Sequence, residues 1–320
     1  MLALLLFAPG IPELLTGSTP VSELVTNPVG FLVGFGFDIG LYGTGALLIR
    51  EFAVAYRKGW ASILLLGAAY GIAEEGFAVH TFFQRTGAPV HALGSYGHAL
   101  GVNWLWALGL TVFHATYSIA LPILLTYLWF PEVSDRRWLD RGALTLVAIV
   151  YLAEVVVFAR LVGHGPSAPL LGLFLAVEAA LLLAGALVPR DLLKPLAGPR
   201  RSGRWGIGFV GTWEWLAWVA VLICSGTRAV PAWIAAGIVL VVDAASLGWV
   251  VRRAGTDDPE RTQFAFATGM LVPLFVWDAF VEFTVPGILA VAALFGYLLY
   301  RLGRTLDRRA RRSAAVPSGA

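Results

Sequence analysis

Two adjacent glutamates, Glu74 and Glu75, lie within an apolar stretch at residues 60–83 and are well placed to do chemistry. A pair of carboxylates can bind a metal ion or transfer protons to and from a reacting water. The stretch is long enough for a membrane-spanning helix, which needs about 20 residues. An ionisable group inside a bilayer costs a few kcal/mol or more, so the pair requires partners or a function. At ~1.5 Å per residue, the pair lies roughly 12 to 14 Å from Phe83.

A buried histidine is predicted at the same depth of the following apolar stretch, residues 104–130. His114 shares one helix face with Thr111, Tyr117 and Ser118, because these residues lie at −3, +3 and +4 from it along the chain. Consecutive spans run antiparallel, so we expect this face to meet the two glutamates. The predicted catalytic residues are Glu74, Glu75 and His114.

Acidic residues also lie inside other apolar stretches. They are Asp38, Glu154, Glu178, Glu214, Asp243, Asp278 and Glu282. Arg160 is the one strong base within a predicted span, so ion pairs cannot neutralise these acids. Some of them must be protonated, or a bound cation must compensate their charge. We predict that the supporting polar residues of the site are Asp38, Thr111, Tyr117, Ser118, Asp278 and Glu282.

Imidazole and carboxylate together suit a divalent metal ion. Zinc accepts both ligand types, and a catalytic zinc keeps one coordination position for water. The sequence therefore predicts Glu75 and His114 as ligands of a divalent metal such as zinc. Four further histidines fall in predicted loops or helix ends on one side of the membrane, where ordinary surface roles are expected: His80, His91, His98 and His164.

The composition is that of a polytopic membrane protein. Of the 320 residues, 58% are hydrophobic and 13% are charged, and the mean hydropathy is +0.77, which a water-soluble domain could hardly reach. The single cysteine, Cys224, excludes an intramolecular disulfide and a multi-cysteine metal cluster. We predict an all-α, polytopic transmembrane helix bundle with nine long spans, at residues 28–49, 60–83, 104–130, 143–162, 170–188, 206–224, 229–251, 264–283 and 286–302.

Residues 1–15 form a shorter apolar segment that contains Glu13 and is broken by Pro9, Gly10 and Pro12. The segment lacks the basic start and the cleavage site of a secretory signal, so we expect a kinked membrane-embedded helix. When the connections are assigned alternately to the two sides, nearly all Lys and Arg residues fall on one side. The positive-inside bias then predicts a multi-pass plasma-membrane protein with a cytoplasmic C-terminus. The same bias explains the net charge of +3, and no nucleic-acid partner is expected.

A single transmembrane domain is predicted at residues 1–302. The longest connection, at 190–205, is basic and either joins two halves, 1–189 and 206–302, or lies on anionic lipid headgroups. Residues 303–320 are rich in arginine and end in small and polar residues, so a disordered, basic cytoplasmic tail is expected. Several glycines are expected to permit close helix packing: Gly34, Gly36, Gly40, Gly67 and Gly71.

Adjacent glutamates in one span and a buried His114 in the next resemble the CAAX-protease-like (CPBP) family of membrane-embedded metalloproteases. The pattern of that family is EExxxR, then FxxxH, then HxxxN or HxxxD, each on a transmembrane helix. The resemblance covers residues 59–121. It implies that Glu74 activates a water and that His114 stabilises an oxyanion or holds a metal.

The sequence departs from this pattern at three positions and lacks a second intramembrane histidine. Val79, Leu110 and Ser118 stand where the family has the arginine, the phenylalanine and the Asn or Asp. The segments LYGTGALLIRE, AYGIAEEG and FHATYSIALPILL are also similar to a set of bacterial multi-span proteins of unknown function. This second resemblance implies no activity.

Three functions are consistent with the sequence. The first is an intramembrane, metal-dependent, protease-like hydrolase of a membrane peptide or lipid, with Glu74 or Glu75 as base and His114 as ligand or oxyanion stabiliser. The second is a proton- or cation-coupled transporter whose intramembrane acids form a continuous path across the bilayer. The third is a non-catalytic membrane scaffold whose buried acids serve packing. In each case the lipid bilayer is a partner.

Overall fold

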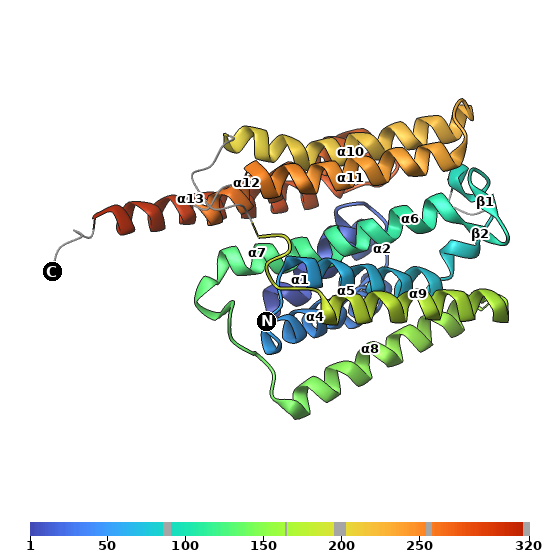
Figure 1. Ribbon diagram of the computed structural model, residues 1–320, viewed down its shortest axis with the longest axis horizontal. Helices are drawn as coiled ribbons and strands as arrows, with labels where there is room; N and C mark the ends of the chain where they lie inside the picture. Colours follow the sequence, from blue (N-terminus) through green and yellow to red (C-terminus); the bar gives the residue numbers. More distant parts are fainter. Residues whose placement is uncertain (86–90, 164, 195–202, 254–257, 316–320) are drawn as a thin grey trace.

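The computed structural model is all α-helical apart from one short hairpin (Figure 1). It describes residues 1–85, 91–163, 165–194, 203–253 and 258–315. Within these residues, nine helices are long and apolar enough to cross a membrane. This confirms the predicted polytopic bundle with nine long spans.

The first three spans are built from several segments, and the other six are single helices. The first consists of α3 Pro28–Asp38, η2 Ile39–Gly43 and α4 Thr44–Ala55, the second of α5 Trp60–Ile72 and η3 Ala73–Ala78, and the third of α6 Trp104–Phe113, η6 His114–Ala120 and α7 Leu121–Trp129. The others are α8 Arg141–Val162, α9 Ala168–Leu187, α10 Arg204–Thr227, α11 Ala232–Arg253, α12 Pro259–Val281 and α13 Ile288–Ala315.

Short elements lie at the N-terminus and between the spans. The chain begins with α1 Leu2–Pro9 and η1 Gly10–Leu14, followed by α2 Glu23–Thr26. The connection between the second and third spans contains η4 Thr81–Phe83, η5 His91–Gly94, β1 His98–Ala99 and β2 Val102–Asn103, and η7 Pro131–Val133 follows the third span. The two strands pair antiparallel, with His98 opposite Asn103.

Four of these segments, η1, η2, η3 and η6, are π-helical turns. A π turn has hydrogen bonds from residue i to i+5, is rare, and is frequent at functional sites. In η1, Pro12 has no backbone N–H and so cannot make a regular helical hydrogen bond. Each π turn carries an ionisable residue: Glu13, Tyr42, Glu74 with Glu75, and His114.

The early spans form the centre of the bundle. In the second span 78% of an 18-residue stretch is buried, whereas no residue of α8 is buried. Figure 1 shows α8 at one edge and α10 to α13 as a layer on the opposite side, with α1, α5, α6 and α7 between them. A polar site that must be shielded from lipid therefore belongs among the first three spans and the N-terminal helix.

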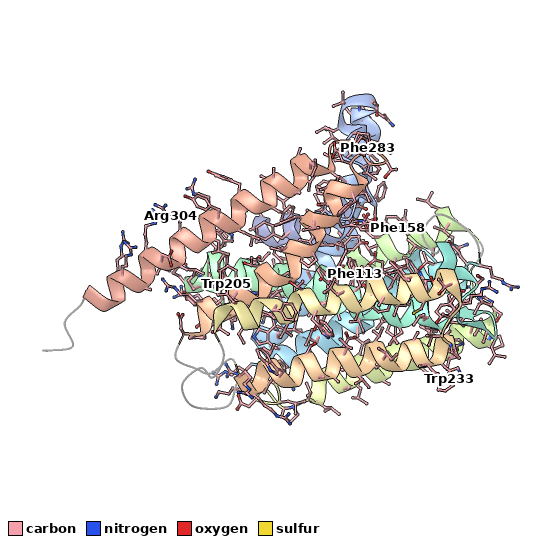
Figure 2. The ribbon with its side chains drawn as sticks, turned by 90° about the horizontal axis from the view of Figure 1, so that it is seen from above. Phe113, Phe158, Trp205, Trp233, Phe283 and Arg304 are labelled. Atoms are coloured by element: carbon pink, nitrogen blue, oxygen red, sulfur yellow. The ribbon has the colours of Figure 1, made fainter. Side chains whose placement is uncertain are left out.

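Large aromatic side chains mark the ends of the outer helices. Trp205, Trp233 and Phe283 are strongly exposed and point outward from the ends of α10, α11 and α12 (Figure 2). Tryptophan is enriched at the membrane–water interface, where its ring lies at the level of the lipid headgroups. These side chains fit interfacial anchoring of the outer layer.

The C-terminal segment differs from its predicted disorder. Where disorder is predicted from residue 303 onward, α13 continues as a helix to Ala315, and residues 316–320 lie outside the described residues. Leu306 is buried in the core, and Arg309 donates two hydrogen bonds, of 2.8 and 3.0 Å, to carbonyl groups at the end of α7. The arginine-rich composition suggests disorder, because the apolar residues that make these contacts occur only about once per helical turn among the charged ones.

A fully buried arginine fixes the connection after the third span. Arg50 of α4 is paired with Glu51, and it donates to the carbonyl oxygens of Val133 and Ser134 at 2.9 and 3.0 Å. Its guanidinium lies 3.7 Å from the centre of the Trp138 ring, a cation–π contact. The charge is therefore compensated locally, at the end of the bundle that the sequence predicts to be cytoplasmic.

Two glycines of α5 let the second and third spans approach closely. A Cβ atom at Gly67 would lie 2.8 Å from the Cα of Ala115, and one at Gly71 would lie 3.0 Å from the Cβ of His114. Such contacts leave no room for a side chain, so both positions serve the close packing that the sequence predicts. The approach places η3, with its two glutamates, beside η6.

Of the other three glycines predicted to permit close packing, Gly40 is closely packed and Gly34 and Gly36 are not. A Cβ atom at Gly40 would collide with the carboxylate of Glu154, so this position is also close-packed. At Gly34 and Gly36 an added Cβ would meet nothing within 4 Å. These two glycines therefore do not serve helix packing within the described chain.

Substitution of Gly67 by alanine is expected to destabilise the protein by about 1–3 kcal/mol, because the added methyl group forces the two backbones apart. Gly36→Ala is the matched control, and it should be neutral or stabilising by roughly 0.5–1 kcal/mol, the usual gain in a helix. Unfolding in detergent, followed by circular dichroism, measures both. Equal stability of the two variants would show that the approach at Gly67 is not tight.

Candidate functional site

His114 lies between two carboxylates of the neighbouring span. Its Nε2 lies 3.0 Å from Glu75 Oε1, and its Nδ1 lies 3.0 Å from Glu74 Oε2. The exposed fractions are 2% for His114, 3% for Glu74 and 8% for Glu75. The π turn η6 carries the histidine, and η3 carries both glutamates. The three residues predicted to be catalytic therefore meet in a buried cluster.

The donors around Glu75 determine which atoms carry protons. The indole N–H of Trp106, which can only donate, donates to Thr81 Oγ1 at 3.1 Å. The hydroxyl of Thr81 is then free to donate to Glu75 Oε2. Glu75 Oε2 is thus an acceptor, and when Glu75 is ionised its Oε1 accepts from the Nε2–H of His114 at 3.0 Å. This tautomer leaves a lone pair on Nδ1, on the side of Glu74.

The hairpin holds the turn that carries Thr81. The side-chain amide of Asn103, which is fully buried, donates to the backbone carbonyl groups of Thr81 (3.3 Å) and Gln84. Its Oδ1 lies 2.5 Å from His98 Nδ1. The contacts run from the loop through Asn103 and Thr81 to Glu75, so the hairpin helps to position the buried carboxylate.

A second set of hydrogen bonds leads from Glu74 to Asp38. The Tyr42 hydroxyl contacts Glu74 Oε1 and also Glu13 Oε1. The Thr19 hydroxyl contacts Glu13 Oε2 at 2.9 Å and Asp38 Oδ2 at 3.3 Å. Each hydroxyl has one proton and contacts two carboxyl groups, so the bridge through Tyr42 requires at least one further proton, which Glu13 can supply, while Thr19 can share its proton between Glu13 and Asp38. The chain can therefore store protons and pass them along.

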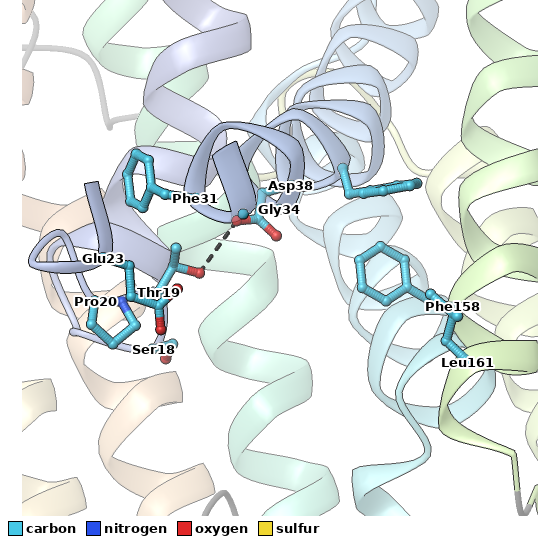
Figure 3. A pocket seen from close by; sticks show the side chains of 11 residues that line it. Ser18, Thr19, Pro20, Glu23, Phe31, Gly34, Asp38, Phe158 and Leu161 are labelled. Atoms are coloured by element: carbon cyan, nitrogen blue, oxygen red, sulfur yellow. Dashed lines mark hydrogen bonds between the residues drawn. The ribbon is translucent and has the colours of Figure 1, made fainter. Parts of the chain in front are cut away.

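Asp38 and Thr19 line a cavity with a volume of about 260 Å³ (Figure 3). It lies between the 18–23 segment, α3 and the end of α8, and the lining residues include Glu23, Phe31 and Phe158. Glu74, Glu75 and His114 do not line it. The buried cluster is thus connected to the cavity by the hydrogen bonds of Thr19, Glu13 and Tyr42.

Apolar packing closes the other side of the cluster. The rings of Tyr42 and Tyr70 each lie 6.0 Å from the His114 ring. Both tyrosines belong to a buried apolar group that continues toward the predicted cytoplasmic end with Ala46, Leu47, Ile63, Ile119 and Ile123. Within the described residues, the hydrogen bonds of the cluster therefore lead toward the side of the membrane that is predicted to be non-cytoplasmic.

One carboxylate oxygen and the donor set fit a metal ion. Glu74 Oε2 is buried and accepts no hydrogen bond from the described residues, although His114 Nδ1 lies 3.0 Å away. With bonds of about 2.0–2.1 Å and a tetrahedral arrangement, two ligand atoms of one zinc ion lie roughly 3.3 Å apart. The zinc ion, and not the carboxylate oxygen, would then lie along the lone pair of the nitrogen. Ser118 Oγ lies 2.9 Å from the same nitrogen. One donor atom from each of Glu74, Glu75 and His114 lies within 4.8 Å of the others.

The predicted supporting residues divide into two groups. Ser118 contacts His114, and Asp38 joins the cluster through Thr19 and Glu13. Thr111 lies beside Gly71, before the π turn begins. The Tyr117 hydroxyl donates to the carbonyl oxygen of Met270 on α12 at 3.2 Å and so points away from the glutamates. The π turn alters the face that regular helical spacing predicts for these residues.

Asp278 and Glu282 lie apart from the hydrogen bonds of the cluster. Asp278 is fully buried in α12, and neither of its oxygens accepts a hydrogen bond within the described chain. Glu282, beyond the end of α12, accepts from the backbone N–H groups of Gly287 and Leu289 at 2.9 Å each. These two bonds lower the pKa of Glu282. Glu282 thus stabilises the turn into α13.

The loop histidines have separate environments. His80, predicted as a surface residue, is buried instead, and burial lowers the pKa of its imidazole. The residue has a positive φ of 59° and precedes η4. His98 contacts Asn103. His164 and the side chain of His91 lie outside the described residues.

Sequence reasoning missed five residues of the network: Glu13, Thr19, Tyr42, Thr81 and Trp106. An acid in an apolar segment broken by prolines was a usable signal for Glu13. The other four are residue types that are common in loops and helix interfaces, so nothing in their local sequence sets them apart.

Replacement of Thr81 by valine is expected to destabilise the protein by about 1–3 kcal/mol, because a buried carboxylate oxygen of Glu75 loses its donor. Thr81→Ser keeps the hydroxyl and should restore most of this loss, and Thr145→Val at an exposed helix position is the control. Unfolding in detergent measures stability, and ¹⁵N NMR of labelled histidine reports the tautomer of His114. Unchanged stability and unchanged His114 nitrogen shifts in Thr81→Val would exclude the orienting role.

Comparisons with known proteins define the family and leave the activity open. Neither a search among curated proteins nor one among solved structures yields a match. The resemblance to the CAAX-protease-like family therefore stays a hypothesis. Residues 2–295 match the model of a family described as an uncharacterized membrane protein family. The chain belongs to this uncharacterized membrane protein family and is an integral, multi-pass membrane protein.

Proposed function

We propose that the protein is a metal-dependent intramembrane hydrolase whose site lies in the half of the bilayer predicted to be non-cytoplasmic. The observation that carries this proposal is the contact of 3.0 Å between His114 Nδ1 and the otherwise unpaired Glu74 Oε2. When His114 is neutral and carries its proton on Nε2, two lone pairs at this distance in a buried site repel one another, and a metal cation against both would remove this repulsion. The donor types and their spacing suit zinc.

The contacts suggest a different role for each of the two glutamates. His114 and Glu74 would hold the metal, with Ser118 beside them. Glu75 faces the far ring nitrogen and, held by Thr81, orients the imidazole, as carboxylates often do for metal-binding histidines. This modifies the sequence-based expectation that Glu75 and His114 are the ligands. When bound, a divalent metal would supply Lewis-acid activation of a water molecule.

Glu74 is also the proposed proton acceptor. Its Oε1 already contacts the Tyr42 hydroxyl, which contacts Glu13 in turn. A proton taken from water by Glu74 can move outward if each group passes one proton to the next, from Glu74 through Tyr42, Glu13 and Thr19 to Asp38. Each group has its original number of protons again once the proton reaches the cavity, and the starting state is restored when the hydroxyl and carboxyl protons turn back. The base is thereby regenerated without an opening to bulk water at the buried cluster.

Transport across the bilayer is less well supported. A transporter predicts a continuous path through Asp38, Glu74, Glu75, Glu154, Glu214, Asp243 and Asp278. Between the described residues, hydrogen bonds join Asp38 to Glu74, and His114 contacts both Glu74 and Glu75, whereas no such connection reaches the other four acids. An inert scaffold is also less well supported, because a buried network of this size is costly and packing alone could be achieved with apolar residues.

Metal content tests the first part of the proposal. The purified wild-type protein should contain about one equivalent of a divalent metal, and Glu74→Gln and His114→Ala should lose it. Glu75→Gln should retain the metal with an affinity lowered roughly 10- to 100-fold, as for other orienting residues. Elemental analysis after dialysis against chelators of graded strength measures all four proteins.

Asp278→Asn is the matched control, since it removes a buried acid outside the cluster and should keep the metal. A wild-type protein without metal, expressed in metal-supplemented medium, would contradict the proposal. Complete loss in Glu75→Gln with retention in Glu74→Gln would reverse the assigned roles.

Hydrolysis itself is tested by isotope transfer. When the protein is incubated in H₂¹⁸O with a membrane extract that contains peptides and lipids, the products should carry one heavy oxygen in each new carboxylate. Glu74→Gln should lower the yield by about 100-fold or more, the usual contribution of a general base. Mass spectrometry of the extract provides the measurement. Equal labelling with wild-type and Glu74→Gln protein would refute the hydrolase.

A further inference from the structure

The cavity beside Asp38 has the features of a binding site for a cation with an organic body. Its polar residues are the carboxylates of Asp38 and Glu23 and the hydroxyl groups of Ser18 and Thr19. None of its lining residues is a lysine, an arginine or a histidine. The carboxylates are therefore not neutralised from within the cavity, and a positively charged ligand would be attracted to it.

Aromatic rings form a second part of the lining. Phe31, Phe37 and Phe158 all border the cavity, and the rings of Phe37 and Phe158 lie edge to face at 6.1 Å. Figure 3 shows Phe31 on one side and Phe158 on the other, with Asp38 between them. Aromatic faces attract cations, and they also accept the carbon atoms of an organic ammonium group.

The volume and the position of the cavity restrict the ligand further. About 260 Å³ is far more than a bare metal ion needs and corresponds to roughly nine water volumes, the size of a small headgroup. The cavity is bordered by α8, which has no buried residue, and by Leu161, which is 73% exposed. Its mouth therefore lies at the lipid-facing end of α3 and α8. A ligand attached to an acyl chain can enter from the bilayer.

We propose that this cavity binds the primary ammonium headgroup of a lipid. Asp38, Glu23 and the two hydroxyl groups supply acceptors for the three N–H bonds of a primary ammonium, which a quaternary ammonium lacks. The carboxylate of Asp38 is the end of the hydrogen-bonded chain that leads to Glu74. The idea that this lipid is the substrate rests on the proposed hydrolase function. The idea that the cavity binds the lipid is tested separately.

Native mass spectrometry of the detergent-solubilised protein tests this binding. Phosphatidylethanolamine should bind about 10-fold or more tightly than phosphatidylcholine or phosphatidylglycerol with the same acyl chains, the effect of one charge-assisted hydrogen bond. Free ethanolamine should bind far more weakly than the lipid. Equal binding of the three lipids overturns the ammonium site, and ethanolamine binding as tight as that of the lipid overturns the lipid as its source.

Two matched substitutions locate the site. Gly34 lines the cavity and Gly36 does not, and an added Cβ at either position meets nothing within 4 Å. Gly34→Leu should fill the cavity and abolish the preference for phosphatidylethanolamine, whereas Gly36→Leu should leave it unchanged. Asp38→Asn should reduce the preference about 10-fold. Retained preference in both Gly34→Leu and Asp38→Asn would place the lipid elsewhere and contradict the proposal.

The metal and the lipid are measured independently. Glu74→Gln should lose the metal and keep the preference for phosphatidylethanolamine, because Glu74 does not line the cavity. A protein that contains metal and shows no lipid preference would overturn the headgroup site and leave the proposed hydrolase standing. A wild-type protein that prefers phosphatidylethanolamine but contains no metal would overturn the proposed hydrolase and leave the headgroup site standing.

Discussion

Buried negative charge without a nearby strong base is the constraint on which the central part of this structure depends. Four carboxyl groups, those of Glu13, Asp38, Glu74 and Glu75, are linked to one another and to a single imidazole. Within the described chain, no lysine or arginine donates to any of them. Removal of a carboxylate from water costs several kcal/mol, so such a group persists only with protons, hydroxyl donors or a bound cation around it. The threonine, tyrosine and tryptophan side chains that donate hydrogen bonds in this network offset part of this cost.

Local helix geometry makes this arrangement possible. Five members of the cluster are carried by π turns on four different segments, η1, η2, η3 and η6: Glu13, Tyr42, Glu74, Glu75 and His114. A regular helix repeats its faces every 3.6 residues, and an inserted π turn shifts the face that follows. Gly67 and Gly71 then let two of these segments come close enough for His114 to lie between both glutamates. The site is thus a product of irregular helices at close approach, surrounded by regular ones.

The sequence predicts the architecture well because its signals are strong. Nine apolar stretches of membrane length correspond to nine helices in the described chain, and Glu74, Glu75 and His114 stand out as ionisable residues among apolar ones. Residues whose contacts depend on tertiary structure were less predictable. Thr19 and Tyr42 look like ordinary loop and packing residues, while Tyr117 turns toward α12 because regular spacing does not hold through η6. The helical end of α13 depends on contacts with α7, which no local pattern encodes.

The one-sided connections of the cluster bear directly on its function. A site that moves a proton or cation across a bilayer must communicate with both sides, at least in alternation. Here the hydrogen-bonded chain ends at a cavity near the outer ends of α3 and α8, and the opposite side is filled by Leu47, Ile119 and Ile123. Exchange with one side suffices for chemistry on a molecule that arrives from that side, since water, protons and substrate can share the route. The same geometry gives Glu13 and Asp38 a place in this exchange, because both carboxyl groups lie on the hydrogen-bonded route between Glu74 and the described cavity.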